Sequence, residues 1–169
     1  MNRYKTIIID DERLAREEVK RALKNYPEFN VVGEASNVDS AIILIEELNP
    51  DILFLDIHMP EKSGFDLLEE LTTVPEVVFT TAYDQYAVKA FEMNALDYLV
   101  KPLREERFSK TIEKVKTELG KKTELSTAIL PMHQKIFIKD GEKCHFVTLT
   151  EIYFIESLEN YARLYFGED

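Results

Sequence analysis

The sequence predicts an α/β protein with a doubly wound, five-stranded parallel sheet, followed by a partial all-β segment. From Thr6 to about Gly120, short apolar runs alternate with amphipathic helical patterns. This alternation is typical of strand and helix units in a parallel sheet. Beyond residue 134 the pattern changes to that of antiparallel strands around Asp140-Gly141, a strong signal for a hairpin turn.

The central strand is predicted at residues 51–56, a short apolar run between helical patterns that ends before Pro60. A run of this length is typical of a strand that is buried on both faces of a parallel sheet. It delivers the Asp56 carboxylate to its carboxyl end, the edge at which open α/β sheets bind ligands. An aspartate after a strand is also an ordinary turn residue, so the meaning of Asp56 depends on the other strand ends.

The other elements of the sheet follow from the same patterns. Apolar and β-branched runs predict strands at residues 6–9, 31–35, 77–80 and 96–100. Apolar residues at three- and four-residue spacing predict helices at about residues 14–26, 41–48, 65–71, 86–94 and 108–120. We expect Asn37 or Asp39 to cap the second helix and Gly120 to end the last.

A linker and a short all-β segment are predicted after the sheet. The stretch from Gly120 to His133 is first Lys-rich and then contains Thr, Ser and Pro131. We therefore divide the chain into residues 1–122, a linker at 123–133, and residues 134–169. Within the last part, strands are predicted at residues 136–138, 144–149, 152–155 and 161–166, with a turn at 158–160. This part is shorter than the roughly 40 residues at which isolated domains become stable.

The composition narrows the class of protein. The net charge of -11 argues against binding nucleic acid by bulk electrostatics, and the hydrophobic fraction of 45% is that of a folded globular chain. No apolar run approaches the roughly 20 residues of a membrane span. The single cysteine, Cys144, fits a reducing cytoplasm and is expected to be a packed strand residue rather than a metal ligand. We therefore expect a cytoplasmic protein without a membrane partner.

Chemically active side chains follow four of the predicted strands, namely Asp10, Asp11, Asp56, Thr81 and Lys101. Because the carboxyl ends of parallel strands share one edge, we expect these side chains to lie together. Three carboxylates in one place repel one another and need a cation, and Mg²⁺ takes oxygen ligands of this kind. With the metal bound, Asp56 can stay ionised and attack a phosphoryl donor, while Thr81 and Lys101 donate to the phosphoryl oxygens.

Each of these residues also has an ordinary structural alternative. The alternatives are a helix cap for Asp10 or Asp11, a turn hydroxyl for Thr81, a surface charge for Lys101 and a plain strand aromatic for Tyr98. Their joint occurrence, each at the same end of its strand, favours a functional site.

Four blocks of sequence resemble the receiver domain of bacterial two-component response regulators. The blocks are residues 9–12, 55–60, 81–82 and 98–102. The resemblance covers residues 3 to about 120. It implies a flavodoxin-like (βα)5 fold and a response regulator in a phosphorelay signal transduction system, with a sensor histidine kinase as partner.

The resemblance also implies a role for individual residues of the metal site. Asp56 is expected to be the phosphoacceptor. Asp11, Asp56 and the backbone carbonyl of His58 are expected to hold Mg²⁺, with Asp10 acting mainly through water.

A switch is implied as well. Thr81 and Tyr98 are the pair expected to report phosphorylation to the face made by the fourth helix, the fifth strand and the fifth helix. A homodimer is expected to form through this face when Asp56 is phosphorylated. The peptide bond between Lys101 and Pro102 is expected to be cis, a form that X-Pro bonds adopt at low cost.

Residues 80–98 resemble the LytR/AlgR branch of this family in particular, and residues 136–141, 152–156 and 160–161 resemble the opening of its LytTR DNA-binding domain. The chain ends at Asp169, before such a domain is complete. Residues 134–169 contain the basic residues Lys135, Lys139, Lys143 and Arg163 against Asp140, Glu142, Glu151, Glu156, Glu159, Glu168 and Asp169. Because phosphate contacts dominate DNA affinity, we expect DNA binding and transcription regulation only in a longer parent chain.

Two other functions compete with this interpretation. One is a stand-alone receiver that acts by protein interaction without a DNA output. The other is a Mg²⁺-dependent phosphohydrolase that uses Asp56 as a covalent nucleophile, as haloacid-dehalogenase-like enzymes do. Such an enzyme needs a second aspartate two residues further on, where this chain has His58. We therefore expect a signalling protein and not an enzyme.

Overall fold

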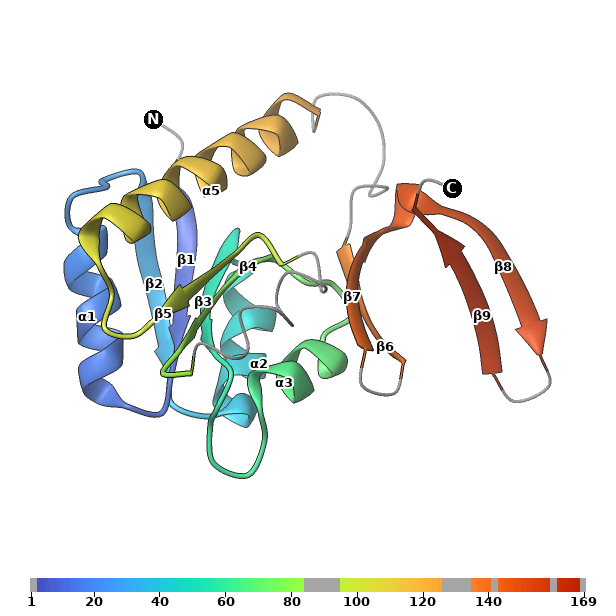
Figure 1. Cartoon of the computed structure of the whole chain (residues 1–169), viewed down its shortest axis with the longest axis horizontal. Helices are drawn as coiled ribbons and strands as arrows, with labels where there is room; N and C mark the ends of the chain where they lie inside the picture. Colours follow the sequence, from blue (N-terminus) through green and yellow to red (C-terminus); the bar gives the residue numbers. More distant parts are fainter. Residues whose placement is uncertain (1–2, 84–94, 126–134, 141–142, 159–160, 168–169) are drawn as a thin grey trace.

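The computed structural model describes residues 3–83, 95–125, 135–140, 143–158 and 161–167 (Figure 1). The predicted parallel sheet is confirmed, with strand order β2-β1-β3-β4-β5 and parallel pairing throughout. Its strands are β1 Tyr4–Ile9, β2 Phe29–Ala35, β3 Ile52–Asp56, β4 Glu76–Thr81 and β5 Asp97–Val100. This order makes β3 the central strand, as the sequence predicts.

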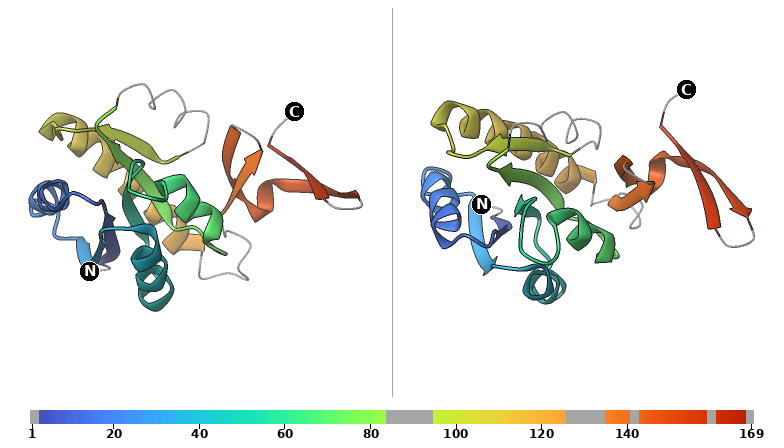
Figure 2. Two further views of the ribbon diagram at one scale, coloured as in Figure 1. Left: turned by 90° about the horizontal axis from the view of Figure 1, so that it is seen from below. Right: turned by 60° about the horizontal axis from the view of Figure 1, so that its bottom comes forward.

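Helices cover both faces of the sheet (Figures 1 and 2). The described helices are α1 Arg13–Leu23, α2 Val38–Leu48, α3 Gly64–Glu70 and α5 Glu105–Leu125. Because successive strand residues face opposite sides, Leu53 and Leu55 of β3 belong to the core under α2 and α3. Ile52 and Phe54 belong to the core under α1 and α5. The helix predicted at residues 86–94 lies outside the described residues.

The ends of α2 follow the sequence signals. The Asn37 side chain caps the helix by accepting a hydrogen bond of 2.9 Å from the Ser40 N–H, as predicted. Asn49 closes it in the left-handed conformation, at φ 45°. Pro50 then prevents any continuation.

The predicted end of the last helix is wrong. Helix α5 continues through Gly120 to Leu125, so its end overlaps the first residues of the stretch predicted as a linker. A glycine inside a helix costs only about 1 kcal/mol relative to alanine, and residues 121–125 include good helix formers. A Cβ at Gly120 would meet nothing within 4 Å, so no close tertiary contact requires a glycine there.

The segment after the linker forms two antiparallel hairpins (Figure 1). The first joins β6 Lys135–Asp140 to β7 Lys143–Thr148, and the second joins β8 Ile152–Leu158 to β9 Tyr161–Phe166. Asp140 pairs with Lys143 and Leu158 with Tyr161, so both pairings fit short turns at the predicted places. The turn residues 141–142 and 159–160 and the side chain of Cys144 lie outside the described set. A short 3-10 helix, η2 Leu149–Glu151, connects the hairpins.

None of the helices within the described residues combines the length and hydropathy that crossing a bilayer requires.

A buried carboxylate joins β5 to α5. Both carboxylate oxygens of Asp97 accept from the Arg107 guanidinium, at 2.5 and 2.8 Å, and Oδ2 also accepts from the Thr111 hydroxyl at 2.6 Å. Burial alone would raise the pKa of Asp97, but the bonds from Arg107 and Thr111 lower it to about 2. The charged form of Asp97 therefore stabilises the folded chain.

The lowered pKa predicts a pH-dependent contribution to stability. Because the folded pKa of Asp97 lies below its unfolded value, the contribution is present at neutral pH and is lost as pH falls toward 2. We expect Asp97→Asn to lower the free energy of unfolding at pH 7 by about 2 kcal/mol, and by roughly half as much at pH 3. Urea unfolding at both pH values measures this difference.

The matched control is Glu47→Gln, which removes an exposed carboxylate from α2. This change should alter the free energy of unfolding by less than about 0.5 kcal/mol at either pH. An equal loss for Asp97→Asn at both pH values would contradict the assigned charge state.

Candidate functional site

The register of the sheet brings the predicted site residues to one edge. Asp56, the last residue of β3, pairs with Thr80 of β4. Thr81 accepts a hydrogen bond of 2.7 Å on its carbonyl from the Lys101 N–H, which places the end of β5 beside the end of β4. On the other side, β1 pairs with β3 up to Leu55 and then delivers Asp10. The carboxyl ends of β1, β3, β4 and β5 therefore meet, as parallel strands require.

An acidic cluster lies at this edge. Asp10, Asp11 and Asp56 offer carboxylate oxygens that lie within 4.8 Å of one another. Asp10 is 1% exposed and Asp56 4% exposed, whereas Asp11 is open to solvent. The two buried carboxylates, Asp10 and Asp56, therefore lie beside an exposed one, Asp11, and the cluster is open to solvent on that side.

The structural alternative for Asp10 and Asp11, a cap of the first helix, is realised in part by Asp10. The N-cap residue of α1 is Glu12, whose side chain makes no cap hydrogen bond. Asp10 Oδ1 accepts from the Glu12 N–H at 3.0 Å and so fixes the entry into the helix. Its other oxygen, Oδ2, faces Lys101, so a single carboxylate serves both the turn and the site.

Lys101 is the ammonium of the site and not a surface charge. Its Nζ lies 2.6 Å from Asp10 Oδ2 and 3.5 Å from Asp56 Oδ2, and its side chain is 16% exposed. Burial opposes the charge of Lys101, but the hydrogen bond with Asp10 and the charge of Asp56 raise its pKa. The peptide bond to Pro102 is cis, the form that the resemblance implies.

Asp56 is held in an unfavourable electrostatic environment. Burial is the largest effect and raises its pKa to about 6; Lys101 opposes this shift and the neighbouring Asp10 adds to it. A hydrogen bond from the main chain of His58 also favours the ionised form. The lysine therefore neutralises only part of the negative charge that the fold assembles.

The donor set fits a divalent cation. The residues that would hold it are Asp10, Asp11 and Asp56, which supply hard carboxylate oxygens within a few ångströms. Mg²⁺ prefers such oxygens and is commonly bound by one or two carboxylates. The expected contact of the His58 carbonyl stays a prediction.

Thr81 and Tyr98 meet at a residue that the sequence did not single out. The Thr81 side chain is fully buried, and its Oγ1 accepts from the Tyr83 N–H at 3.3 Å, so the turn-hydroxyl alternative is real. The Tyr98 hydroxyl, which is largely buried, donates to the Tyr83 carbonyl. The Tyr83 ring lies 5.0 Å from the ring of His58, which follows Asp56 by two residues. Tyr83 therefore links the two expected switch residues to the loop after β3.

Two residues of α1 fix the loops that carry the site. Arg16 Nη1 donates to the carbonyls of Asp10 and Asp11, at 2.7 and 3.3 Å. Glu18 accepts from the Leu103 N–H at 2.9 Å, just after the cis bond. No sequence pattern pointed to these residues, because each acts on the main chain of a loop and Glu18 acts across 85 positions. In the sequence, each of them is only a charged residue within an amphipathic helix. Such residues usually lie on the solvent-exposed face of the helix and do not indicate a site.

Gly64 is required by the close approach of α3 to the site. A Cβ at this position would lie 2.3 Å from the carbonyl oxygen of Asp56, which belongs to the backbone and cannot move aside. The Gly64 N–H donates a hydrogen bond of 2.9 Å to the Ile57 carbonyl. The start of α3 therefore packs directly on the strand end that carries Asp56.

Comparison with known proteins agrees with this geometry. The chain matches the sequence model of the family described as response regulator receiver domain over residues 6–113. It is 40% identical over 163 residues to "Sensory transduction protein LytT" of Enterococcus faecalis, an alignment that covers 94% of this chain and 67% of that protein. It is 42% identical to "Transcriptional regulatory protein BtsR" of Salmonella typhi, covering 78% of this chain and 54% of that protein. The chain thus spans about half to two thirds of these relatives.

Solved structures show the same fold. The response regulatory domain of mrkE from Klebsiella pneumoniae superposes with a TM-score of 0.62 at 31% identity. The REC domain of AraT from Geobacillus stearothermophilus superposes with a TM-score of 0.63 at 31% identity. These matches cover 69 and 71% of this chain and 98% of each solved chain. The likeness therefore concerns the sheet and its helices.

The raised pKa of Asp56 predicts a stabilising substitution. With a folded pKa of about 6, the ionised carboxylate lowers stability as pH rises from 4 to 6, and the full penalty is present at pH 7. Without divalent cations, Asp56→Asn should raise the free energy of unfolding at pH 7 by about 1 to 3 kcal/mol, with little gain at pH 4. Urea unfolding in the presence of a chelator measures both values.

The control for this prediction is Asp39→Asn, which removes a carboxylate whose side chain is 74% exposed. This change should alter stability by less than about 0.5 kcal/mol. A loss of stability in Asp56→Asn at pH 7 would show that its charge is not penalised.

The contacts of Arg16 predict weaker metal binding when they are removed. Arg16→Met should weaken Mg²⁺ binding about tenfold, because the loop that carries Asp10 and Asp11 loses the hydrogen bonds that Arg16 donates to its carbonyls. Isothermal titration calorimetry with Mg²⁺ measures the affinity. Arg13→Met removes an exposed arginine from the same helix and should leave the affinity unchanged. Equal affinities of the two variants would exclude a positioning role for Arg16.

Proposed function

This chain belongs to the response regulator receiver family, and on that basis we propose that it accepts a phosphoryl group on Asp56 from a sensor histidine kinase. The observation that carries the proposal is the charge arrangement around Asp56. This carboxylate ends the central strand, is 4% exposed, lies 3.5 Å from the Lys101 ammonium and shares a cluster with two further carboxylates. Such an arrangement suits an acid that works as a nucleophile and not as a surface charge.

The transfer is a single displacement at phosphorus. A carboxylate oxygen of Asp56 attacks the phosphorus of a phosphohistidine, and the new O–P bond forms as the P–N bond to the imidazole breaks. The electron pair of that bond goes to the imidazole nitrogen, which takes up a proton. Mg²⁺, when bound by the acidic cluster, supplies positive charge that offsets the carboxylates and the phosphoryl oxygens.

Lys101 and Thr81 are the donors that we assign to the phosphoryl oxygens. Lys101 already faces both Asp10 and Asp56, so its ammonium is within reach of a group added to Asp56. At about 4 Å and an effective dielectric near 20, such a charge pair is worth roughly 4 kcal/mol. Thr81 gives up its contact with the Tyr83 N–H when it turns to the phosphoryl group, and Tyr98 responds because its hydroxyl is bonded to the same residue.

The output is proposed to pass through the face of the fourth helix, β5 and α5, by formation of a homodimer. The residues predicted to form the fourth helix lie outside the described set. Of the rest of this face, Val100 is an exposed apolar residue on β5. We also propose that the protein works in the cytoplasm, where a sensor histidine kinase would donate the phosphoryl group.

Residues 134–169 are proposed to be the first part of a LytTR DNA-binding domain. The alignment with LytT supports this, because it covers 94% of this chain and so extends past the receiver through the first hairpin. DNA binding and transcription regulation then belong to a longer parent chain. The alternative is a receiver that acts through protein contacts alone.

Intact mass spectrometry tests the proposal. With Mg²⁺ and acetyl phosphate, the wild type should gain one phosphoryl group, and Asp56→Asn or the omission of Mg²⁺ should abolish the gain. Asp51→Asn is the matched control, since Asp51 directly precedes the same strand at its opposite end, and it should be modified like the wild type.

Two outcomes would contradict the proposal in different ways. Absence of any adduct would exclude Asp56 as the phosphoacceptor. Rapid consumption of the donor without a lasting adduct would favour the phosphohydrolase alternative.

A further inference from the structure

The first hairpin of the segment after the linker is docked on the receiver. The main chain of Lys135, at the start of β6, forms an antiparallel bridge with Val74, and the Val74 N–H donates to the Lys135 carbonyl at 3.0 Å. Val74 lies two residues before the first residue of β4, at the end of that strand opposite Thr81. The chain beyond the linker therefore returns to the sheet at the edge opposite the candidate site.

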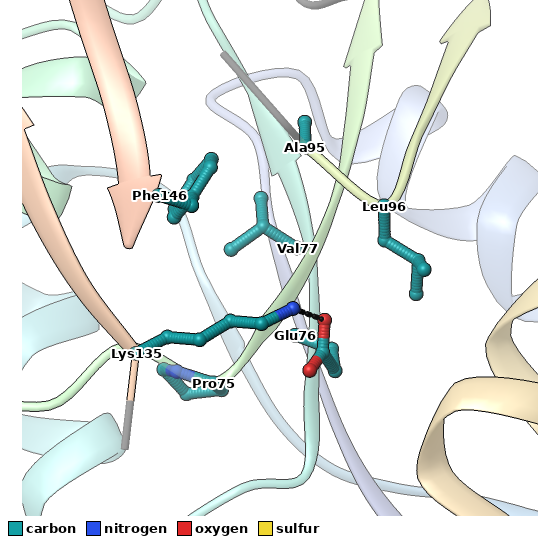
Figure 3. A pocket seen from close by; sticks show the side chains of 7 residues that line it. All are labelled: Pro75, Glu76, Val77, Ala95, Leu96, Lys135 and Phe146. Carbon is teal, nitrogen blue, oxygen red and sulfur yellow. Dashed lines mark hydrogen bonds and ion pairs between the residues drawn. The ribbon is translucent and has the colours of Figure 1, made fainter. Parts of the chain in front are cut away.

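A buried ion pair holds this contact (Figure 3). Lys135 Nζ lies 2.7 Å from Glu76 Oε2, and the Glu76 side chain is 1% exposed while that of Lys135 is 18% exposed. A carboxylate at this depth is costly unless a cation accompanies it. The receiver thus has a buried carboxylate at the first residue of β4, and the hairpin supplies the cation that pairs with it.

Apolar packing completes the contact. Phe146 is 6% exposed and Val147 1% exposed, and both lie on β7. The Phe146 ring lies 6.4 Å from the Phe79 ring on β4 and 5.2 Å from the Phe137 ring on β6. Figure 3 shows Phe146 and Lys135 around one small pocket with Leu96, which precedes β5.

The second hairpin is different. Tyr153, Phe154 and Ile155 of β8 are 63, 55 and 59% exposed. The first hairpin therefore packs on the receiver, whereas β8 presents these three apolar residues to solvent.

We propose that Val74, Glu76, Phe79 and Leu96 form a docking surface of the receiver for the β6–β7 hairpin, and that docking is coupled to the switch at Asp56. The first half stands on the contacts above, and the second rests on the proposed function. Phe79 lies two residues before Thr81 on β4, and Leu96 lies two residues before Tyr98 on β5. Two residues of the docking surface, Val74 and Phe79, belong to the same apolar cluster as Tyr98 and Phe146. A rearrangement of Thr81 and Tyr98 therefore moves the strands on which the hairpin rests.

Hydrogen exchange of the whole chain tests the docking. We expect the amides of β6 and β7 to be protected in the wild type and to exchange about tenfold faster in Phe146→Ala. The matched control is Phe154→Ala, which truncates an exposed phenylalanine of β8 and should leave this protection unchanged. Equal protection in Phe146→Ala and the wild type would overturn the proposed docking.

A second variant keeps the test independent of the apolar core. Lys135→Met leaves Glu76 without its docked cation, so the undocked form, in which water reaches Glu76, gains population. We expect faster exchange in β6 and β7 while the amides of β1 and β3 keep their protection. Unchanged exchange in β6 and β7 would show that the ion pair does not hold the hairpin.

Beryllofluoride with Mg²⁺, as a phosphoryl analogue, tests the coupling. We expect it to change the protection of β6 and β7 by about threefold or more in the wild type and not in Asp56→Asn, and Lys135→Met to change its affinity by the same factor. Binding of the analogue without any change in the hairpin would refute the coupling and leave the proposed function intact. Failure of the analogue to bind would refute the proposed function and the coupling together, while Lys135→Met and Phe146→Ala still decide the docking.

Discussion

An imbalance of charge at the carboxyl edge of the sheet is the constraint on which the site depends. Within the described residues, Asp10, Asp11 and Asp56 crowd their oxygens within 4.8 Å, and Lys101 is the ammonium that faces them. The fold holds this arrangement against its own repulsion. Burial is the main cause of the raised pKa of Asp56, and the neighbouring Asp10 adds to it, so the ionised site favours added positive charge.

The surrounding structure serves to keep the crowded edge in place. Helix α1 holds the acidic loop through Arg16 and the loop after Lys101 through Glu18, so both sides of the site are tied to one rigid element. Gly64 lets α3 approach the backbone of Asp56 more closely than any side chain would permit. The apolar residues buried in the strands offset the stability lost by crowding charged groups at the site. The site residues are thereby held in fixed positions.

The sequence was sufficient to predict the sheet and the strand-end residues, because strand length, periodicity and the shared edge of parallel strands are local or topological signals. It failed at Gly120, where a weak helix breaker lies among strong helix formers and the helix continues. It also missed Arg16, Glu18 and Tyr83. Arg16 and Glu18 act on main-chain groups of loops, Glu18 across 85 positions, and Tyr83 acts through its own main chain. The docking of β7 depends on tertiary complementarity, which no periodicity encodes.

The pKa of Asp56 tests the central claim most directly. Its carboxyl carbon can be followed by NMR across the pH range, with Asp56→Asn used to assign the signal, in the absence and presence of saturating Mg²⁺. Burial of the carboxyl group, together with the neighbouring Asp10, predicts a pKa of about 6 without the metal, and the charge of Mg²⁺ predicts a value well below this. A midpoint near the ordinary value of about 4 that Mg²⁺ leaves unchanged would contradict the account.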